Sequence, residues 1–150
     1  MNDTSVKIRN RYQIRSYQHV LDVTFFYLML AESQYFNKDL SSSYNLSDDP
    51  DNAINNDQLL TLLKESLKLY DIDLSIEYVD HYFKETDRLI LNNSKIKDIL
   101  SWHNICKTKD IIEDLSKWFY ISKNELDLKG FIEEIYEDYL KKYLSKNESE

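Results

Sequence analysis

The chain has 150 residues, of which 42% are hydrophobic and 31% are charged, and its formal net charge at pH 7 is −8. This length and composition predict a single folded domain over 1–150 with its own apolar core, and they exclude a wholly disordered chain. The only glycine is Gly130, so the chain contains no Walker A loop, no GxGxxG dinucleotide turn and no GxSxG nucleophile elbow.

The first predicted element is a helix over about 11–36. Apolar residues recur there at three- and four-residue steps from Ile14 to Leu28, which is the spacing of one helix face. The run 25–30 is apolar on every side, so we expect this helix to be packed from several directions and to form the centre of the core.

Residues 37–56 change in character. They contain Pro50 and many Ser, Asn and Asp residues, and they predict a long acidic and polar loop. A loop of this length inside a compact domain is typically functional or mobile.

Four further helices follow in the prediction, each from its apolar spacing and a capping residue. Their expected ranges are 57–71, capped by Asn56 or Asp57; 75–91, capped by Ser75; 94–105, capped by Ser94; and 109–121, capped by Thr108.

The last helix has the clearest pattern. Ser122 and Glu125 have the spacing of a capping box, and an apolar stripe without a break follows from Leu128 to Leu144. Residues 145–150 are expected to fray. The fold class predicted from the whole chain is all-α, a bundle or orthogonal array of about six helices in one domain.

The sequence predicts a cytoplasmic protein without a membrane segment. Cys106 is the only cysteine, so no internal disulfide forms. The N-terminus lacks the pattern of a secretory signal, and no apolar run approaches the roughly 20 residues that cross a bilayer. Lys, Asn, Ile and Tyr are frequent, which indicates an AT-rich gene.

No metal or cofactor is expected. Segments 71–82 and 125–136 resemble calcium loops only in part, because neither ends in the bidentate glutamate that closes the coordination shell. Glu77, His81 and Glu85 share one face of the expected helix but span about 12 Å, too far for one ion. His103 and Cys106 have the spacing of half a zinc site, without a second cysteine to complete it.

We expect that the protein is not an enzyme. Cys106 lies beside Lys107 and Lys109 and could act as a nucleophile with His103 or His81. A lone cysteine is more commonly a small buried apolar residue, so a small helical enzyme centred on Cys106 and His103 is kept only as the second alternative.

The charge distribution favours a basic protein partner. Residues 1–19 carry a net charge of +3, so the rest of the chain carries −11, which disfavours direct binding to nucleic acid or to anionic membranes. The carboxylates gather on the last helix and in the long loop, and the chain has 12 Tyr residues, a type preferred in protein interfaces. The candidate partner-binding residues are Tyr44, Asp48, Asp49, Asp51, Glu133, Glu134, Glu137 and Asp138.

These features predict a small acidic inhibitor that binds and blocks a basic protein such as a nuclease toxin or an effector. Immunity proteins, antitoxin-like inhibitors and anti-defence proteins fit this description. The first alternative is a viral helical regulator of the Bcl-2-like kind that binds a partner helix in a groove. The short Asn-Trp-Gly-Arg signature of such regulators is absent, and residues 101–104 read Ser-Trp-His-Asn instead.

Overall fold

The computed structural model describes residues 5–40, 43–79 and 85–147. Within these residues the chain forms five α-helices and five short strands. The described part is therefore mainly helical, as predicted, but the strands show that the fold is not purely all-α. The helices are α1 (Val20–Phe36), α2 (Asn56–Lys68), α3 (Ser94–Leu100), α4 (Thr108–Lys123) and α5 (Leu128–Asn147). The strands are β1 (Ser5–Ile8), β2 (Ile14–Arg15), β3 (Ile54–Asn55), β4 (Ser75–Tyr78) and β5 (Arg88–Leu89).

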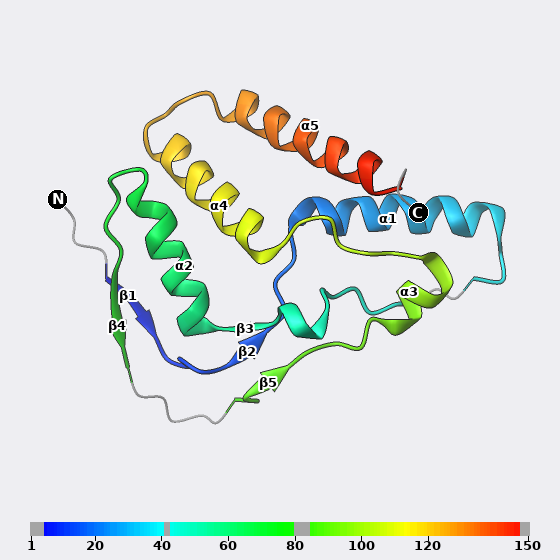
Figure 1. Cartoon of the computed structure of the whole chain (residues 1–150), viewed down its shortest axis with the longest axis horizontal. Coiled ribbons are helices and arrows are strands. Elements are labelled where there is room, and N and C mark those ends of the chain that lie inside the picture. Colours follow the sequence, from blue (N-terminus) through cyan, green and yellow to red (C-terminus); the bar gives the residue numbers. More distant parts are fainter. Residues whose placement is uncertain (1–4, 41–42, 80–84, 148–150) are drawn as a thin grey trace.

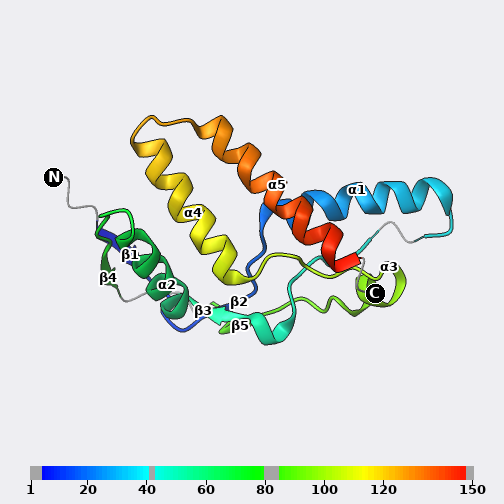
Figure 2. The ribbon, with the colours of Figure 1, turned by 45° about the horizontal axis from the view of Figure 1, so that its top comes forward.

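In the view of Figure 1 the helices α2, α4, α5 and α1 follow one another across the molecule, and the turned view of Figure 2 shows α3 near the C-terminal end of α5. The turned view shows α4 and α5 as an antiparallel pair, with the N-terminal half of α1 beside them (Figure 2). A short 3-10 helix, Pro50–Asn52, precedes β3 in the connection between α1 and α2.

The five strands form two narrow sheets at the edge of α2, which together we call the ribbon. The ribbon corrects two predictions. β1 pairs in parallel with β4, and β2 lies between an antiparallel β3 and a parallel β5. The prediction of a helix over 75–91 is therefore wrong for the residues of this range that the structure describes. The first helix begins at Val20 rather than near residue 11. Pairing with a distant segment overrides the local helical spacing at both places.

The starts of α2, α3 and α4 lie close to their predicted positions, but the capping residues differ. Asn55 and Gln58 form a capping box at α2, with Asn55 accepting a hydrogen bond from the Gln58 backbone N–H at 2.8 Å. The predicted box of Ser122 and Glu125 is wrong, because Ser122 lies inside α4. The carboxylate of Asp127 accepts instead from the backbone N–H of Gly130 at 2.9 Å in the first turn of α5.

Three helices are followed by a residue in the left-handed backbone conformation, and none of these residues is glycine. Asp71, Ser101 and Glu125 have φ angles of 57°, 50° and 53° after α2, α3 and α4. Glycine is the residue that usually occupies this position at a helix end. The only glycine of the chain lies in the first turn of α5 and has no positive φ.

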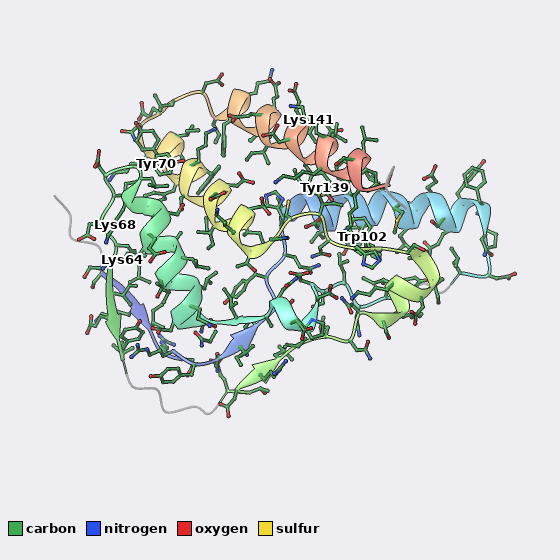
Figure 3. All side chains as sticks on the ribbon, viewed as in Figure 1. Lys64, Lys68, Tyr70, Trp102, Tyr139 and Lys141 are labelled. Carbon is green, nitrogen blue, oxygen red and sulfur yellow. The ribbon has the colours of Figure 1, made fainter. Side chains whose placement is uncertain are left out.

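The buried core around α1 joins three parts of the chain. Phe26 of α1, Ile96 of α3 and Trp102 form a buried cluster, with the rings of Phe26 and Trp102 5.5 Å apart. Figure 3 shows Tyr139 between α5 and α1, with Trp102 on the other side of α1. The opposite face of α1 is exposed, so this helix is not the centrally packed element that its composition predicts.

The predicted long loop is an integral part of this core over residues 43–49. Tyr44 and Leu46 pack against the Phe26 cluster, and Ser47 and Asp48 are buried. The side-chain amide of Asn93 donates hydrogen bonds to the carbonyls of Ser47 and Asp48 at 3.0 and 3.3 Å. At the other end of the chain, α5 extends to Asn147, beyond the predicted start of fraying, and residues 148–150 lie outside the described part.

Candidate functional site

An apolar groove of about 620 Å³ lies where the start of α1 meets α4 and α5. We call it the α1/α4/α5 groove. Its walls are mostly large apolar side chains that are substantially exposed, among them Val20 (69%), Leu115 (45%), Trp118 (43%), Ile132 (54%) and Tyr136 (44%). Exposed apolar side chains gathered in one concave place are typical of an interaction site.

The sequence positions these side chains by helical spacing. Ile111, Leu115 and Trp118 follow one another at four- and three-residue steps along α4, and on α5 Ile132 lies three residues before Ile135 and four before Tyr136. These positions belong to the predicted apolar stripes of their helices. The structure leaves part of each stripe uncovered.

The start of α1 is held against α4 by His19, which is buried. Its Nδ1 accepts a hydrogen bond from the backbone N–H of Leu21 at 3.2 Å, and its Nε2 lies 3.3 Å from a carboxylate oxygen of Asp114 on α4. An imidazole that accepts at Nδ1 carries its proton on Nε2, so His19 donates to Asp114. This pair joins two walls of the groove.

A second, polar cavity of about 190 Å³ lies between α4 and α5, and we call it the α4/α5 cleft. Asp114 and Ile135 line both the groove and the cleft, so the two share a wall. The charged lining of the cleft consists of five carboxylates and two lysines, namely Asp110, Glu113, Asp114, Glu134, Asp138, Lys117 and Lys142. The cleft is therefore acidic.

Two lysine–carboxylate pairs bridge the cleft. Lys117 Nζ lies 2.8 Å from both carboxylate oxygens of Glu134, and Lys142 Nζ lies 2.8 Å from Asp110 Oδ1. Burial works to raise the pKa of Asp110, but the hydrogen bonds from Lys142 and from the backbone N–H of Lys107 outweigh it and lower that pKa below its usual value. Both pairs link α4 to α5 and keep the charges of the cleft fixed in place.

A buried carboxylate, Asp22 of α1, lies at the base of this region. It accepts hydrogen bonds from the backbone N–H groups of Ile105 and Cys106 at 2.8 and 3.2 Å, and from the Tyr139 hydroxyl at 2.9 Å. Desolvation raises the pKa of Asp22 despite these three bonds. Asp22 thus connects α1 to α5 and to the segment before α4.

Cys106 is buried in the same network, where burial and the carboxylate of Asp22 raise the pKa of its thiol to about 12. A thiol with this pKa is protonated at neutral pH, and the thiolate is the nucleophilic form. His103 lines a different small cavity together with Asp49 and Lys97. The two residues of the enzyme alternative thus line different cavities, and His81 lies outside the described residues.

The four acidic candidates on α5 lie on more than one side of the helix. Glu133 lines the groove and lies 3.6 Å from Lys129. Glu134 and Asp138 line the cleft, where Glu134 pairs with Lys117, and Asp138 also pairs with Lys141 at 3.1 Å. Glu137 is exposed.

The candidates in the loop lie away from the groove, and their environments differ. Asp48 is buried and accepts from the backbone N–H of Asp49 and from the Asn52 amide. A hydrogen bond from Lys97 lowers the pKa of Asp49. Tyr44 packs edge-on against Phe26, and Asp51 is exposed. Asp51 is thus the only exposed residue among the three candidate carboxylates Asp48, Asp49 and Asp51.

Sequence reasoning missed the apolar side of the site. Val20, Leu115, Trp118, Ile132 and Tyr136 line the groove, yet the sequence places most of them on core stripes. Two features of the sequence could have indicated the groove: the apolar stripes are wide, and the first helix is apolar on every side. Together they amount to more apolar surface than one small core covers.

Across the described ranges 5–40, 43–79 and 85–147, no three His, Cys, Asp or Glu residues are arranged to hold a metal ion. In the same ranges no helix combines the length and apolar character that crossing a membrane requires. No protein-family model matches the chain, and no curated protein matches its sequence.

Proposed function

We propose that the protein acts by binding another protein, and that it inhibits a basic partner such as a nuclease toxin or an effector. An immunity protein, an antitoxin-like inhibitor or an anti-defence protein acting in the cytoplasm has this role. The observation that carries the proposal is the α1/α4/α5 groove, an exposed apolar depression beside an acidic cleft in a chain of net charge −8.

The groove supports the binding of a protein segment rather than of a small polar ligand. Eight of its twelve lining residues are apolar, with Trp118 and Tyr136 as large rings at the surface. Aromatic side chains at interfaces bury a large area and commonly dominate the binding energy. A helix or an extended segment with apolar side chains on one face fits such a groove.

The charges near the groove support a basic partner. Asp114 and Glu133 line the groove itself, and the carboxylates of the cleft begin on the other side of the shared wall. Lysine or arginine residues beside the apolar positions of the partner would meet these carboxylates. Such complementarity mainly speeds association and orients the partner.

The groove wall also contains an unsatisfied donor. The side-chain amide nitrogen of Gln18 is buried, and no acceptor lies within hydrogen-bond distance among the described residues. The nitrogen is closed to solvent in this structure, so a carbonyl of the bound segment would satisfy it only after the side chain turns toward the groove.

The test compares proteins captured from the native source by three versions of the chain. Leu115→Glu places a charge in the groove, and Leu69→Glu adds the same charge at an exposed leucine (79%) after α2. We expect a stoichiometric basic protein to be retained by the wild type and by Leu69→Glu and to be lost from Leu115→Glu. A partner retained equally by all three versions, or no partner at all, would contradict the proposal.

Association kinetics with the captured partner then test the charge argument. Glu133→Lys combined with Glu137→Lys should slow association by about tenfold at low salt and weaken its salt dependence, because steering acts on the association rate. Glu133 lines the groove and Glu137 is exposed. An unchanged association rate would show that these carboxylates do not steer the partner.

The groove itself favours one second candidate, the helical regulator of the Bcl-2-like kind. In that case the occupant is a partner helix with apolar residues at i, i+3, i+4 and i+7, and its charge is not decisive. Loss of binding in Leu115→Glu without any salt dependence in the wild type would select this candidate over the basic partner.

A further inference from the structure

The two carboxylates that line the α1/α4/α5 groove differ in their partners. Glu133 is largely exposed and lies 3.6 Å from the ammonium group of Lys129. The side chain of Asp114 is only 32% exposed, and among the described residues no lysine or arginine lies within ion-pair distance of its carboxylate. Asp114 is thus a partly buried carboxylate in the groove wall without a cation beside it.

The other carboxylates of the α4/α5 cleft show how unusual this is. Each of the four pairs with a lysine, namely Asp110 with Lys142, Glu113 with Lys109, Glu134 with Lys117 and Asp138 with Lys141. The closest match to Asp114 is Asp110, because its side chain is 29% exposed and its lysine lies at 2.8 Å. Burial of a carboxylate is costly unless a cation or hydrogen-bond donors compensate for the lost water. Asp114 has the burial of Asp110 without the lysine.

His19 does not supply the missing charge. Its Nδ1 accepts from the backbone N–H of Leu21 at 3.2 Å, so the imidazole carries its one proton on Nε2 and is neutral. This Nε2 lies 3.3 Å from Oδ2 of Asp114, and no described residue bonds to Oδ1. His19 therefore orients the carboxylate and leaves one oxygen for an incoming donor.

The surroundings of Asp114 favour arginine as that donor. Asp114 lines both the groove and the cleft, and Trp118 follows four residues later in the groove wall, 43% exposed. Side chains four residues apart on a helix are neighbours. A planar guanidinium binds a carboxylate and stacks on an aromatic ring, and it is more weakly hydrated than the ammonium group of lysine.

We propose that the segment bound in the α1/α4/α5 groove carries an arginine beside its apolar residues, and that the guanidinium of this arginine binds Asp114. The apolar walls contribute most of the contact area, and Asp114 fixes the register of the segment and selects for arginine. Because the groove is proposed to bind a protein segment, this contact rests on the proposed function.

Selected peptides serve as the probe. Phage-displayed random peptides of about 16 residues, long enough for four helical turns, are selected on the full wild-type chain. Counter-selection on Leu115→Glu then keeps only those peptides that need the groove, since Leu115 lines it and is 45% exposed. We expect the remaining peptides to share an arginine at a fixed spacing from their apolar residues.

A double-mutant cycle with one of these peptides, followed by fluorescence anisotropy, tests the contact itself. Asp114→Asn removes the charge but keeps an oxygen that accepts from His19, and citrulline in place of the peptide arginine removes the other charge at nearly the same shape. Each change alone should weaken binding about tenfold, and both together little more, because they remove the same ion pair. Asp138→Asn is the matched control at a carboxylate that pairs with Lys141, and its affinity should stay within about twofold of the wild type.

The possible failures separate this contact from the proposed function. Groove peptides without a shared arginine, an affinity that Asp114→Asn leaves unchanged, or additive losses in the cycle would overturn the role of Asp114 while the groove remained a binding site. If no selected peptide were excluded by Leu115→Glu, the groove would bind no protein segment, and both proposals would be wrong.

Discussion

Two aspartates in different regions of the molecule have opposite pKa shifts. Asp22 lies in the buried network between α1 and α5, and desolvation raises its pKa. Asp57 lies in the first turn of α2 beside the strand ribbon, where hydrogen bonds from Arg11 and from the Tyr78 hydroxyl lower its pKa. The buried aspartate has three hydrogen-bond donors but no cation among the groups that bond to it, whereas the other aspartate binds a guanidinium.

The difference shows how the two regions are held together. Asp22 is fully buried and accepts hydrogen bonds from the backbone N–H groups of Ile105 and Cys106, so its loss leaves these donors without that acceptor. Asp57 joins Arg11 and Tyr78 near the surface, with the guanidinium of Arg11 also 4.5 Å above the ring of Tyr78. We therefore expect the helical region to depend on Asp22 far more than the ribbon depends on Asp57.

The largest expected effect is that of Asp22→Ala. Three donors lose their acceptor, and each unsatisfied buried donor costs about 1–3 kcal/mol, so the free energy of unfolding should fall by roughly 3–5 kcal/mol. Tyr139→Phe removes one of the three bonds and should cost about 1–2 kcal/mol. Urea unfolding measures both, with the exposed Asp138→Ala as control, expected within about 0.5 kcal/mol of the wild type.

The pH dependence should have opposite signs at the two sites. A raised folded-state pKa means that the part of the stability that depends on protonation of Asp22 is present below its unfolded pKa of 3.8 and is lost as the pH rises through the raised value. A lowered pKa means that the contribution of Asp57 is present above 3.8 and is lost as the pH falls through the lowered value. Urea unfolding of the wild type, Asp22→Asn and Asp57→Asn across acidic pH measures both contributions. If the difference in unfolding free energy between wild type and variant changed with pH in the same direction at both sites, this comparison would be refuted.

Removal of the cation in the ribbon should have a smaller effect. Arg11→Gln should lower the unfolding midpoint by less than Tyr139→Phe does, because exposed ion pairs contribute little. The shift should largely disappear near 1 M salt, where the Debye length is about 3 Å. Thermal unfolding measures the shift, and Arg9→Gln, the same change at another exposed arginine, is the control.

The smallest expected effects concern the left-handed helix ends. Ser101 closes α3 in the core region, and Asp71 follows α2 in the ribbon region, both with positive φ. Serine tolerates this conformation less well than aspartate. Ser101→Gly should stabilise the protein by about 0.5–1 kcal/mol and Asp71→Gly by less, as measured by urea unfolding; equal effects would show that the aspartate gains nothing from its side chain.

The sequence predicts the helices whose apolar spacing is local and complete. α4 lies close to its predicted range, α5 covers its predicted apolar stripe although it begins at Leu128 rather than after Ser122, and the described residues are mainly helical as expected. The ribbon could not be predicted, because Ser75–Tyr78 becomes a strand only by pairing with Ser5–Ile8, far away in the chain. The start of α1 was misplaced because Ile14 and Tyr17 continue its spacing, although Ile14 lies in β2.

Of the candidate site, the sequence indicates only the carboxylates and not the apolar groove. Composition places carboxylates on the last helix, but it does not show that Glu133 and Glu134 lie in different depressions or that Asp48 is buried. The groove could not be predicted, because an apolar stripe has the same spacing whether a neighbouring helix covers it or not. Only the arrangement of α1, α4 and α5 distinguishes the two cases.

The parallel pairing of the ribbon has a consequence for the order in which the chain folds. Ser5 pairs with Ser75 and Ile14 with Arg88, so the two partners of each pair are more than 65 residues apart. Closing such long loops is entropically costly and slow, whereas helical turns form locally. The strands β1 and β2 are synthesised before their parallel partners β4 and β5, which follow more than 65 residues later. These two strands are thus among the last elements to complete their pairing.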